Sequence, residues 1–154
     1  MCSITIDSVD RLIKFVIPLF ADEFDIVDSS DEAVSFFLYG GCLELAKVVK
    51  HYYPDTKYAI SKDYNHICSL DNDRLYDALD FYEDWQLKKY NIINDKRVSD
   101  FIALKDDEIE KMPVNYGVIN YINGVELSKA IINMIDGIES IKIKKKDLKL
   151  NCTL

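Results

Sequence analysis

The chain of 154 residues lacks the features of several specialised protein classes. No apolar run approaches the roughly 20 residues that cross a membrane. No basic region precedes an apolar one at the N-terminus, so we expect neither a membrane protein nor a secretory signal. The four cysteines, at positions 2, 42, 68 and 152, form no dense framework. That scarcity excludes a disulfide-stabilised secreted domain and indicates a reducing cytoplasm.

Basic residues are also few, with 19 Lys and Arg against 27 Asp and Glu, which gives a net charge of −8. This balance disfavours sequence-independent binding to a nucleic acid backbone. The acidic surface either keeps the protein in solution or binds a basic partner. Lysines gather near the C-terminus, where they indicate either an edge strand protected by charge or a small basic contact patch; these are Lys142, Lys144, Lys145, Lys146 and Lys149.

What is present favours one folded domain over residues 1–154. Hydrophobic residues make up 49% and charged residues 30% of the chain, which is typical of a folded protein with its own core. We find no internal repeat, low-complexity tract or linker. Helical and strand patterns occupy separate segments, so the predicted class is α+β.

The N-terminal segment has the pattern of two helices. Residues 8–17 carry apolar side chains at helical spacing, and Pro18 is expected to limit that helix. Ser29 and Glu32 have the spacing of a capping box, which predicts the start of a second helix that ends at Gly40.

A third helix and three strands are predicted next. The helix starts at Cys42 and is stopped by Pro54. The short segments 57–61, 66–70 and 74–78 are rich in apolar and aromatic residues and are separated by turn sequences. We expect them to form a three-stranded antiparallel meander packed on the Cys42 helix.

The remaining sequence is less regular. Residues 81–112 are mixed and charged, and 114–122 are expected to contain a strand or two. Asn123 and Glu126 form a capping-type pair, which predicts a helix that ends near Gly137. A final apolar segment within 141–150 is expected to close the sheet.

The corner Gly40-Gly41-Cys42 is the most informative feature of the chain. Paired glycines allow a sharp turn and a close approach of the backbone to other groups. Cys42 then lies in the first turn of a helix, where unpaired N–H groups and the helix dipole favour a thiolate. This position is typical of a nucleophile.

His66 and Asp77 are the expected partners of that thiol. A two-residue hairpin turn near Asn72 places them opposite each other on neighbouring strands. A carboxylate there fixes the imidazole tautomer, so cysteine, histidine and carboxylate form a candidate nucleophile, base and orienter. Asp80 is the rival orienter. His51 is the only other histidine and is interpreted as a surface or helix-capping residue.

Residues 39–80 resemble small papain-like cysteine-hydrolase domains of bacterial and phage proteins. The resemblance rests on a Gly-Gly-Cys helix start, a strand that begins at His66, a short turn, and a strand end of Tyr76 and Asp77. It implies a papain-like fold, a Cys42, His66 and Asp77 triad, and chemistry on amide or thioester bonds. Hydrolysis of a peptide, deamidation and transamidation remain open.

The sequence departs from that family at two positions. Phe36 lies six residues before Cys42, where papain-like peptidases often have a glutamine that donates to the oxyanion. Leu79 and Asp80 occupy the place of a glycine that is expected soon after Asp77. These departures concern activity more than architecture.

Alternative interpretations stay open beside the hydrolase. The same scaffold would serve as an acidic protein-binding inhibitor, for example one encoded by a phage against a host protein, with the triad unused. In a third interpretation, Cys42, His66 and Cys68 bind a metal, although no Cys-x-x-Cys pair supports this. Cys68 and Cys42 also suit simple core packing. For the hydrolase we expect no cofactor, no metal and no nucleic acid or membrane partner; the expected partner is a protein or peptide.

Overall fold

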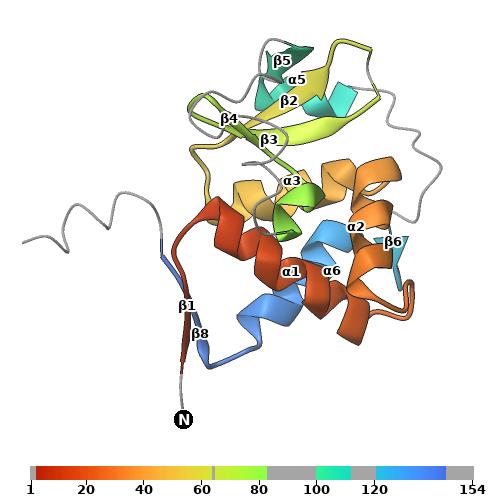
Figure 1. Ribbon diagram of the computed structural model, residues 1–154, viewed down its shortest axis with the longest axis vertical. Helices are drawn as coiled ribbons and strands as arrows, with labels where there is room; N and C mark the ends of the chain where they lie inside the picture. The colour runs from red at the N-terminus through yellow and green to blue at the C-terminus, as the bar shows by residue number, and fades with distance from the viewer. Residues whose placement is uncertain (1–2, 64, 83–99, 112–120, 145–154) are drawn as a thin grey trace, which may run out of the picture.

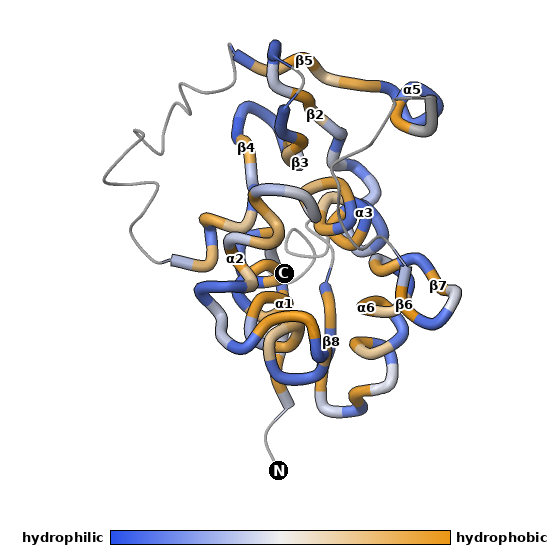
Figure 2. The backbone as a smooth tube through the Cα atoms, turned by 90° about the vertical axis from the view of Figure 1, so that its right-hand side faces the viewer, coloured by the Kyte–Doolittle hydropathy of each residue, from blue (hydrophilic) through white to orange (hydrophobic). Residues whose placement is uncertain are grey.

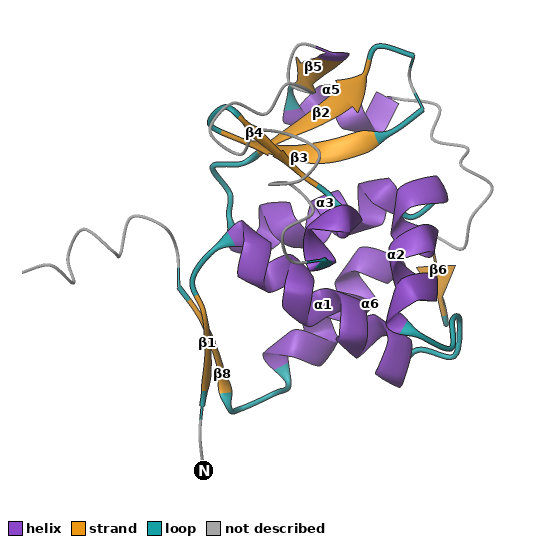
Figure 3. Cartoon of the chain, viewed as in Figure 1, coloured by secondary structure: helices purple, strands orange, loops and turns teal. Residues whose placement is uncertain are grey.

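The computed structural model describes residues 3–63, 65–82, 100–111 and 121–144 in an α+β arrangement. A group of helices lies beneath an antiparallel sheet, and the cysteine-bearing helix α3 (Cys42–Tyr52) lies between the sheet and the other helices (Figures 1 and 3). Helix α3 contacts strand β3 (Ile67–Asp71) directly. The predicted class and the predicted packing of the Cys42 helix on the strands are therefore confirmed.

The remaining elements of the described residues surround this pair. They are β1 (Ile4–Ile6), α1 (Val9–Glu23), α2 (Ser30–Tyr39), β2 (Lys57–Ser61), β4 (Arg74–Tyr76), the 3₁₀ helix η1 (Ala78–Phe81), β5 (Phe101–Leu104), α5 (Asp106–Lys111), β6 (Tyr121–Ile122), β7 (Val125–Glu126), α6 (Leu127–Asp136) and β8 (Ile141–Ile143). Hydrophobic and hydrophilic stretches alternate within α1 and α6 (Figure 2), as expected of helices with one buried face.

The sheet has the order β4-β3-β2-β5, and each pair of neighbours is antiparallel. The predicted meander is confirmed as β2, β3 and β4. Strand β5 adds a fourth strand that was not predicted. Its apolar residues, 101–104, lie within a charged part of the sequence that obscured the strand pattern. His66 lies immediately before the first residue of β3, and Asp77 lies immediately after the last residue of β4.

The predicted hairpin register was wrong by one or two residues. Asp71 pairs with Arg74 and Leu70 with Leu75, so the two-residue turn is centred between Asn72 and Asp73 rather than near Asn72. Asn72 adopts a positive φ of 56°, as this tight turn requires. Asp77 is consequently not paired across the hairpin with His66; it lies just beyond the end of β4.

Helix α1 continues past Pro18 to Glu23, contrary to the prediction. A proline inside a helix removes one backbone hydrogen bond and costs about 3 kcal/mol. The last turns of α1 carry Phe20, which is fully buried and packs on the rings of Phe36 and Phe37. Burial of such a side chain contributes about 1.5–3 kcal/mol, which offsets much of that cost.

The corner between α2 and α3 requires a glycine at position 41. A Cβ there would lie 2.5 Å from Cε2 of Phe36 and 3.0 Å from Cδ1 of Phe37, closer than carbon atoms approach each other. Helix α2 ends at Tyr39, after a start at which Ser29 Oγ accepts from the Glu32 N–H at 3.1 Å. The predicted start of the next helix at Cys42 is confirmed.

The start of helix α6 differs from the prediction. Asn123 and Gly124 form the turn between β6 and β7, with φ values of 51° and 81°, so Asn123 does not cap the helix. The buried carboxylate of Glu44 caps it instead, since Oε1 accepts from the Ser128 N–H at 3.0 Å. The cap comes from α3, 84 residues away along the chain, and local spacing could not reveal it. The predicted end near Gly137 is confirmed.

The C-terminal strand does not close the sheet. Strand β8 pairs in parallel with β1 and forms a separate two-stranded sheet beside the helices (Figure 1). The predictions for 114–120, for Lys145, Lys146 and Lys149, and for an apolar strand beyond 144 lie outside the described residues. In the described part of the chain, no helix has the length and apolarity that crossing a membrane needs.

Candidate active site

The three residues predicted as a site come from three elements that meet where the helices contact the sheet. Cys42 is the first residue of α3, His66 immediately precedes β3, and Asp77 follows β4 as the N-cap of η1. His66 Nε2 lies 3.0 Å from Asp77 Oδ2. The predicted contact between His66 and Asp77 is therefore confirmed, although the register behind the prediction was not.

Asp77 is held in place by the backbone around it. Its Oδ1 accepts from the Leu79 N–H at 2.9 Å, while its own N–H donates to Asp80 Oδ2 at 2.9 Å. This reciprocal capping box fixes the carboxylate, and Oδ2 is left facing His66. Of the two rival carboxylates, Asp77 contacts the imidazole and Asp80 supports the backbone of Asp77.

His66 is anchored by Ser61 on the neighbouring strand. The His66 N–H donates to Ser61 Oγ at 3.0 Å, and its carbonyl accepts from the Ser61 N–H at 2.8 Å. Its side chain remains 20% exposed. Burial lowers the pKa of His66, but hydrogen bonds with Asp77, Cys42 and Cys68 outweigh burial and raise that pKa to about 12. The imidazole is thus held as a cation between a carboxylate and thiols.

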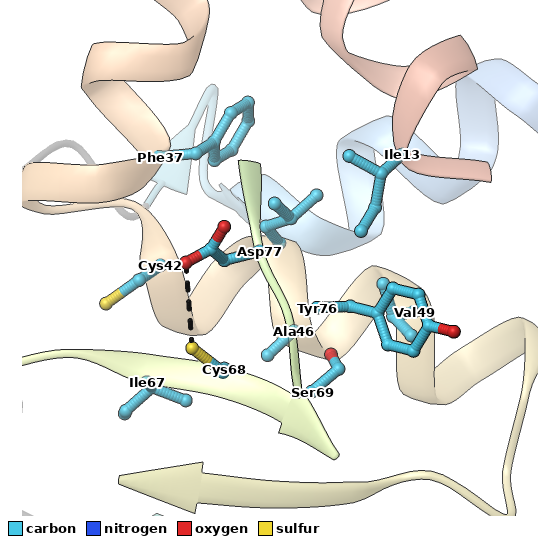
Figure 4. Close-up of a pocket in the computed structure, with 11 residues that line it drawn as sticks. Ile13, Phe37, Cys42, Ala46, Val49, Ile67, Cys68, Ser69, Tyr76 and Asp77 are labelled. Carbon is cyan, nitrogen blue, oxygen red and sulfur yellow. Dashed lines mark hydrogen bonds between the residues drawn. The ribbon is translucent and has the colours of Figure 1, made fainter. Parts of the chain in front are cut away.

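Cys42 is nearly enclosed, with 3% of its surface exposed. It belongs to a buried apolar cluster with residues of α3, the sheet and α5, including Ala46, Ile67 and Ile109. The cavity beside it, drawn in Figure 4, has no room for a water molecule. Nε2 of His66 faces Asp77, and Cys42 is one of the neighbours that raise the pKa of the ring. A substrate can reach the sulfur only if part of this cover moves.

Cys68 lies beside this site, and the sequence predicted it as a core residue or as a metal ligand with Cys42 and His66, without its contact to Asp77. It is 1% exposed, as expected of a core residue, but its Sγ also lies 3.8 Å from Asp77 Oδ2. Figure 4 shows Asp77 between the start of α3 and the strand that carries Cys68. The available signal was strand alternation, which places Cys68 and His66 on one face. The ligand-type atoms of His66, Cys68 and Asp77 lie within 4.8 Å of one another, and Asp77 stands where the predicted metal set had Cys42.

Asp80 is a second buried carboxylate and lies next to Asp77. Burial and the charge of Asp77 raise the pKa of Asp80 to about 7, against the opposing effects of the Asp77 N–H and of Arg74. Arg74 Nη2 lies 3.4 Å from Asp80 Oδ1, and its guanidinium stacks on Tyr76 at 4.7 Å. Positive charge thus flanks the two carboxylates, with His66 beside Asp77 and Arg74 beside Asp80.

Phe36 occupies an apolar position rather than a donor position. Its ring stacks on Phe20 at 5.1 Å and meets Phe37 edge to face at 5.1 Å. It therefore belongs to the core of the helical layer. The amide donor that papain-like peptidases place here has no counterpart in its side chain.

Comparison with known proteins gives one finding about descent. No curated protein and no solved structure matches the chain. A family model described as Phage YunG-like protein matches residues 20–119, a stretch that includes Cys42, His66, Cys68 and Asp77. The chain therefore belongs to the Phage YunG-like protein family.

Proposed function

We propose that the protein is a papain-like cysteine hydrolase that acts on an amide or peptide bond, with Cys42 as nucleophile, His66 as proton carrier and Asp77 as orienter. The observation that carries this proposal is the 3.0 Å contact between His66 Nε2 and Asp77 Oδ2, on a ring whose pKa Cys42 helps to raise. A carboxylate on one ring nitrogen directs the other nitrogen to the thiol.

The proposed reaction follows from the charge on His66. With its pKa raised, His66 rests as an imidazolium that faces Cys42. Cys42 attacks the carbonyl carbon as a thiolate, and His66 donates its proton to the leaving nitrogen as the C–N bond breaks. The neutral imidazole then takes a proton from water, which attacks the thioester and releases the acid. Asp77 keeps the ring in one orientation through both steps.

The start of α3 is the candidate site for the oxyanion. Gly41 is the N-cap and has no side chain that could bond to the first N–H groups of the helix. Those donors and the helix dipole suit a developing negative charge at the substrate carbonyl. Since Phe36 supplies no amide, the site has one donor fewer than papain-like peptidases often have. Loss of one such donor typically slows the reaction by ~10²–10³.

Alkylation by iodoacetamide at neutral pH tests the proposal without a known substrate. Cys42 should react faster than the other three cysteines, and His66→Ala should slow that reaction. The rate of Cys68, which is also almost fully buried, is the comparison for the rate of Cys42 in the wild type. His51→Ala is the matched control variant and should change neither rate. Equal reactivity of all four thiols, or no effect of His66→Ala, would overturn the proposal.

One observation favours a second candidate function, an acidic protein-binding inhibitor. Exposed carboxylates line the segment from the end of α1 to the start of α2, here called the acidic face. Within the described residues, no ion pair joins them to Lys or Arg. They are Asp22, Glu23, Asp25, Asp28, Asp31 and Glu32. Residues 15–46 contain no Lys or Arg. Such a one-signed surface attracts a basic partner.

The variant Cys42→Ala separates the two functions. An inhibitor should keep its binding and its effect in this variant, whereas a hydrolase should lose all activity. Binding through the acidic face should also weaken steeply as salt rises, and Asp22→Asn combined with Asp25→Asn should weaken it further. Binding that is insensitive to salt and to these substitutions would contradict the second function.

A further inference from the structure

Cys68 is a buried thiol for which the proposed hydrolase has no use. It lies on the strand face shared with His66, and its Sγ is 3.8 Å from the same Asp77 oxygen that contacts His66 Nε2. One carboxylate oxygen thus lies close to both an imidazole nitrogen and a sulfur. This is a compact set of imidazole, thiol and carboxylate atoms, all within 4.8 Å of one another.

We propose that His66 Nε2, Cys68 Sγ and Asp77 Oδ2 form a binding site for a zinc ion. The set has the ligand types that zinc takes in proteins, while a thiolate makes magnesium or calcium unsuitable. Three protein ligands leave the fourth position of a tetrahedron open. The site goes beyond the proposed function, because Cys42 is not one of its ligands.

The spacing of the three atoms fits a tetrahedral ion. Bond lengths of about 2.0 Å to nitrogen and oxygen and about 2.3 Å to sulfur separate tetrahedral ligands by about 3.3 Å for the N and O pair and about 3.5 Å for the S and O pair. The corresponding separations here are 3.0 and 3.8 Å. These two pairs lie within a few tenths of an ångström of the tetrahedral spacing, and the third pair, Nε2 and Sγ, lies within 4.8 Å.

Contacts behind the ligands already hold them in position. Asp77 Oδ1 accepts from the Leu79 N–H, and Oδ2 is the oxygen that faces His66 and Cys68. The backbone of His66 is bonded on both its N–H and its carbonyl to Ser61. Such second contacts orient metal ligands and commonly change affinity 10–100-fold. Entry of the ion displaces protons from His66 and Cys68 into solvent.

Zinc and hydrolysis would exclude each other, a consequence that rests on the proposed function. Both need His66 and Asp77, and an imidazole bound to zinc through Nε2 no longer contacts the Asp77 carboxylate as a free orienter. The zinc site is therefore a candidate means of inhibition. Cys68 separates the two roles, since it binds the ion but takes no part in the reaction.

Titration of the chelator-stripped and reduced 154-residue protein with cobalt(II) tests the site, because cobalt bonded to a thiolate absorbs in the near ultraviolet. The wild type should bind one equivalent, zinc should displace it, and Cys42→Ser should retain the band. Cys68→Ser should lose the band. His66→Gln, which keeps both thiols, should weaken binding at least about 10-fold, and His51→Gln should not.

The outcomes distinguish this proposal from the hydrolase. No band in the wild type, a band that persists in Cys68→Ser, or a band lost in Cys42→Ser would overturn the zinc site whatever the alkylation rates are. If Cys68→Ser fails to fold by circular dichroism, His66→Gln against His51→Gln decides. Conversely, cobalt binding in Cys42→Ser supports the zinc site even if Cys42 shows no special reactivity.

Discussion

Two groups of carboxylates in this protein stand in opposite surroundings. Asp77 and Asp80 are 5% and 2% exposed, and both accept backbone hydrogen bonds and contact a cationic side chain. The carboxylates of the acidic face, such as Asp22 and Asp25, are exposed and carry no ion pair to Lys or Arg in the described residues.

The difference teaches how position decides what an aspartate does. A buried carboxylate needs hydrogen-bond or charge partners, so its atoms have fixed positions and a substitution there lowers stability. An exposed carboxylate keeps its water and contributes charge, and only the total charge of the face matters. We therefore expect single substitutions of Asp77 or Asp80 to change the free energy of unfolding, and single substitutions on the acidic face to leave it almost unchanged.

The largest effect is expected for Asp77→Ala. The change removes the cap of η1, worth about 1 kcal/mol, and leaves the buried side of His66 unpaired, which costs about 1–3 kcal/mol. We expect the free energy of unfolding to fall by about 2–4 kcal/mol, measured by urea denaturation. The matched variant Asp25→Ala should change it by no more than about 0.5 kcal/mol. Equal losses of stability in the two variants would contradict the difference between buried and exposed carboxylates.

The next effect concerns the corner that buries Cys42. Gly41→Ala should destabilise the protein by about 1–3 kcal/mol, because the new Cβ collides with the rings of Phe36 and Phe37. Gly137→Ala is the control, since a Cβ there meets only carbonyl oxygens at 3.4 and 3.5 Å. Its change in thermal unfolding should be small. A tolerated alanine at position 41 would show that the corner opens readily.

Asp80 should make stability depend on pH. Its pKa is raised from 3.8 to about 7, so the folded state holds a proton that the unfolded state has released across that range. Protonation of Asp80 therefore adds to the free energy of unfolding. This contribution is complete below pH 3.8 and is lost as pH rises through about 7; it is at most about 1.4 kcal/mol per unit of pKa shift. In Asp80→Asn, this fall should vanish. Unfolding by urea at a series of pH values measures the difference, and parallel curves would contradict it.

The smallest effect is expected on the acidic face. Asp22→Asn with Asp28→Asn should alter the free energy of unfolding by less than about 0.5 kcal/mol per substitution. Any gain from relieved repulsion should disappear at about 1 M salt, where the Debye length is only about 3 Å. Thermal unfolding at low and high salt measures this. A large loss of stability would mean that these carboxylates have structural partners.

The sequence predicted the parts of the fold that depend on local rules. Caps and turn residues located the N-cap of α2 at Ser29 and the start of α3 at Cys42, and short apolar segments between turns located β2, β3 and β4. Contacts distant in sequence were beyond its reach. The cap on α6 comes from Glu44, and β8 pairs with β1, because partners far apart along the chain leave no local signal.

The candidate site was predictable to a similar extent. His66 and Asp77 were expected to meet, and they do so even though the hairpin register is shifted, because Asp77 leaves the strand and turns into η1. The closeness of Cys68 to Asp77 and the enclosure of Cys42 depend on how α3 and α5 pack on the sheet. Spacing alone does not determine such packing.

Titration of the His66 ring by NMR tests the central claim most directly, namely that Cys42, His66 and Asp77 act as one unit. In the wild type, with the resonance assigned against His51→Gln, the pKa of His66 should lie far above 6.5, and it should fall in Cys42→Ser and further in Asp77→Asn. A His66 that titrates near 6.5 in the wild type and is unchanged in Cys42→Ser would contradict the account.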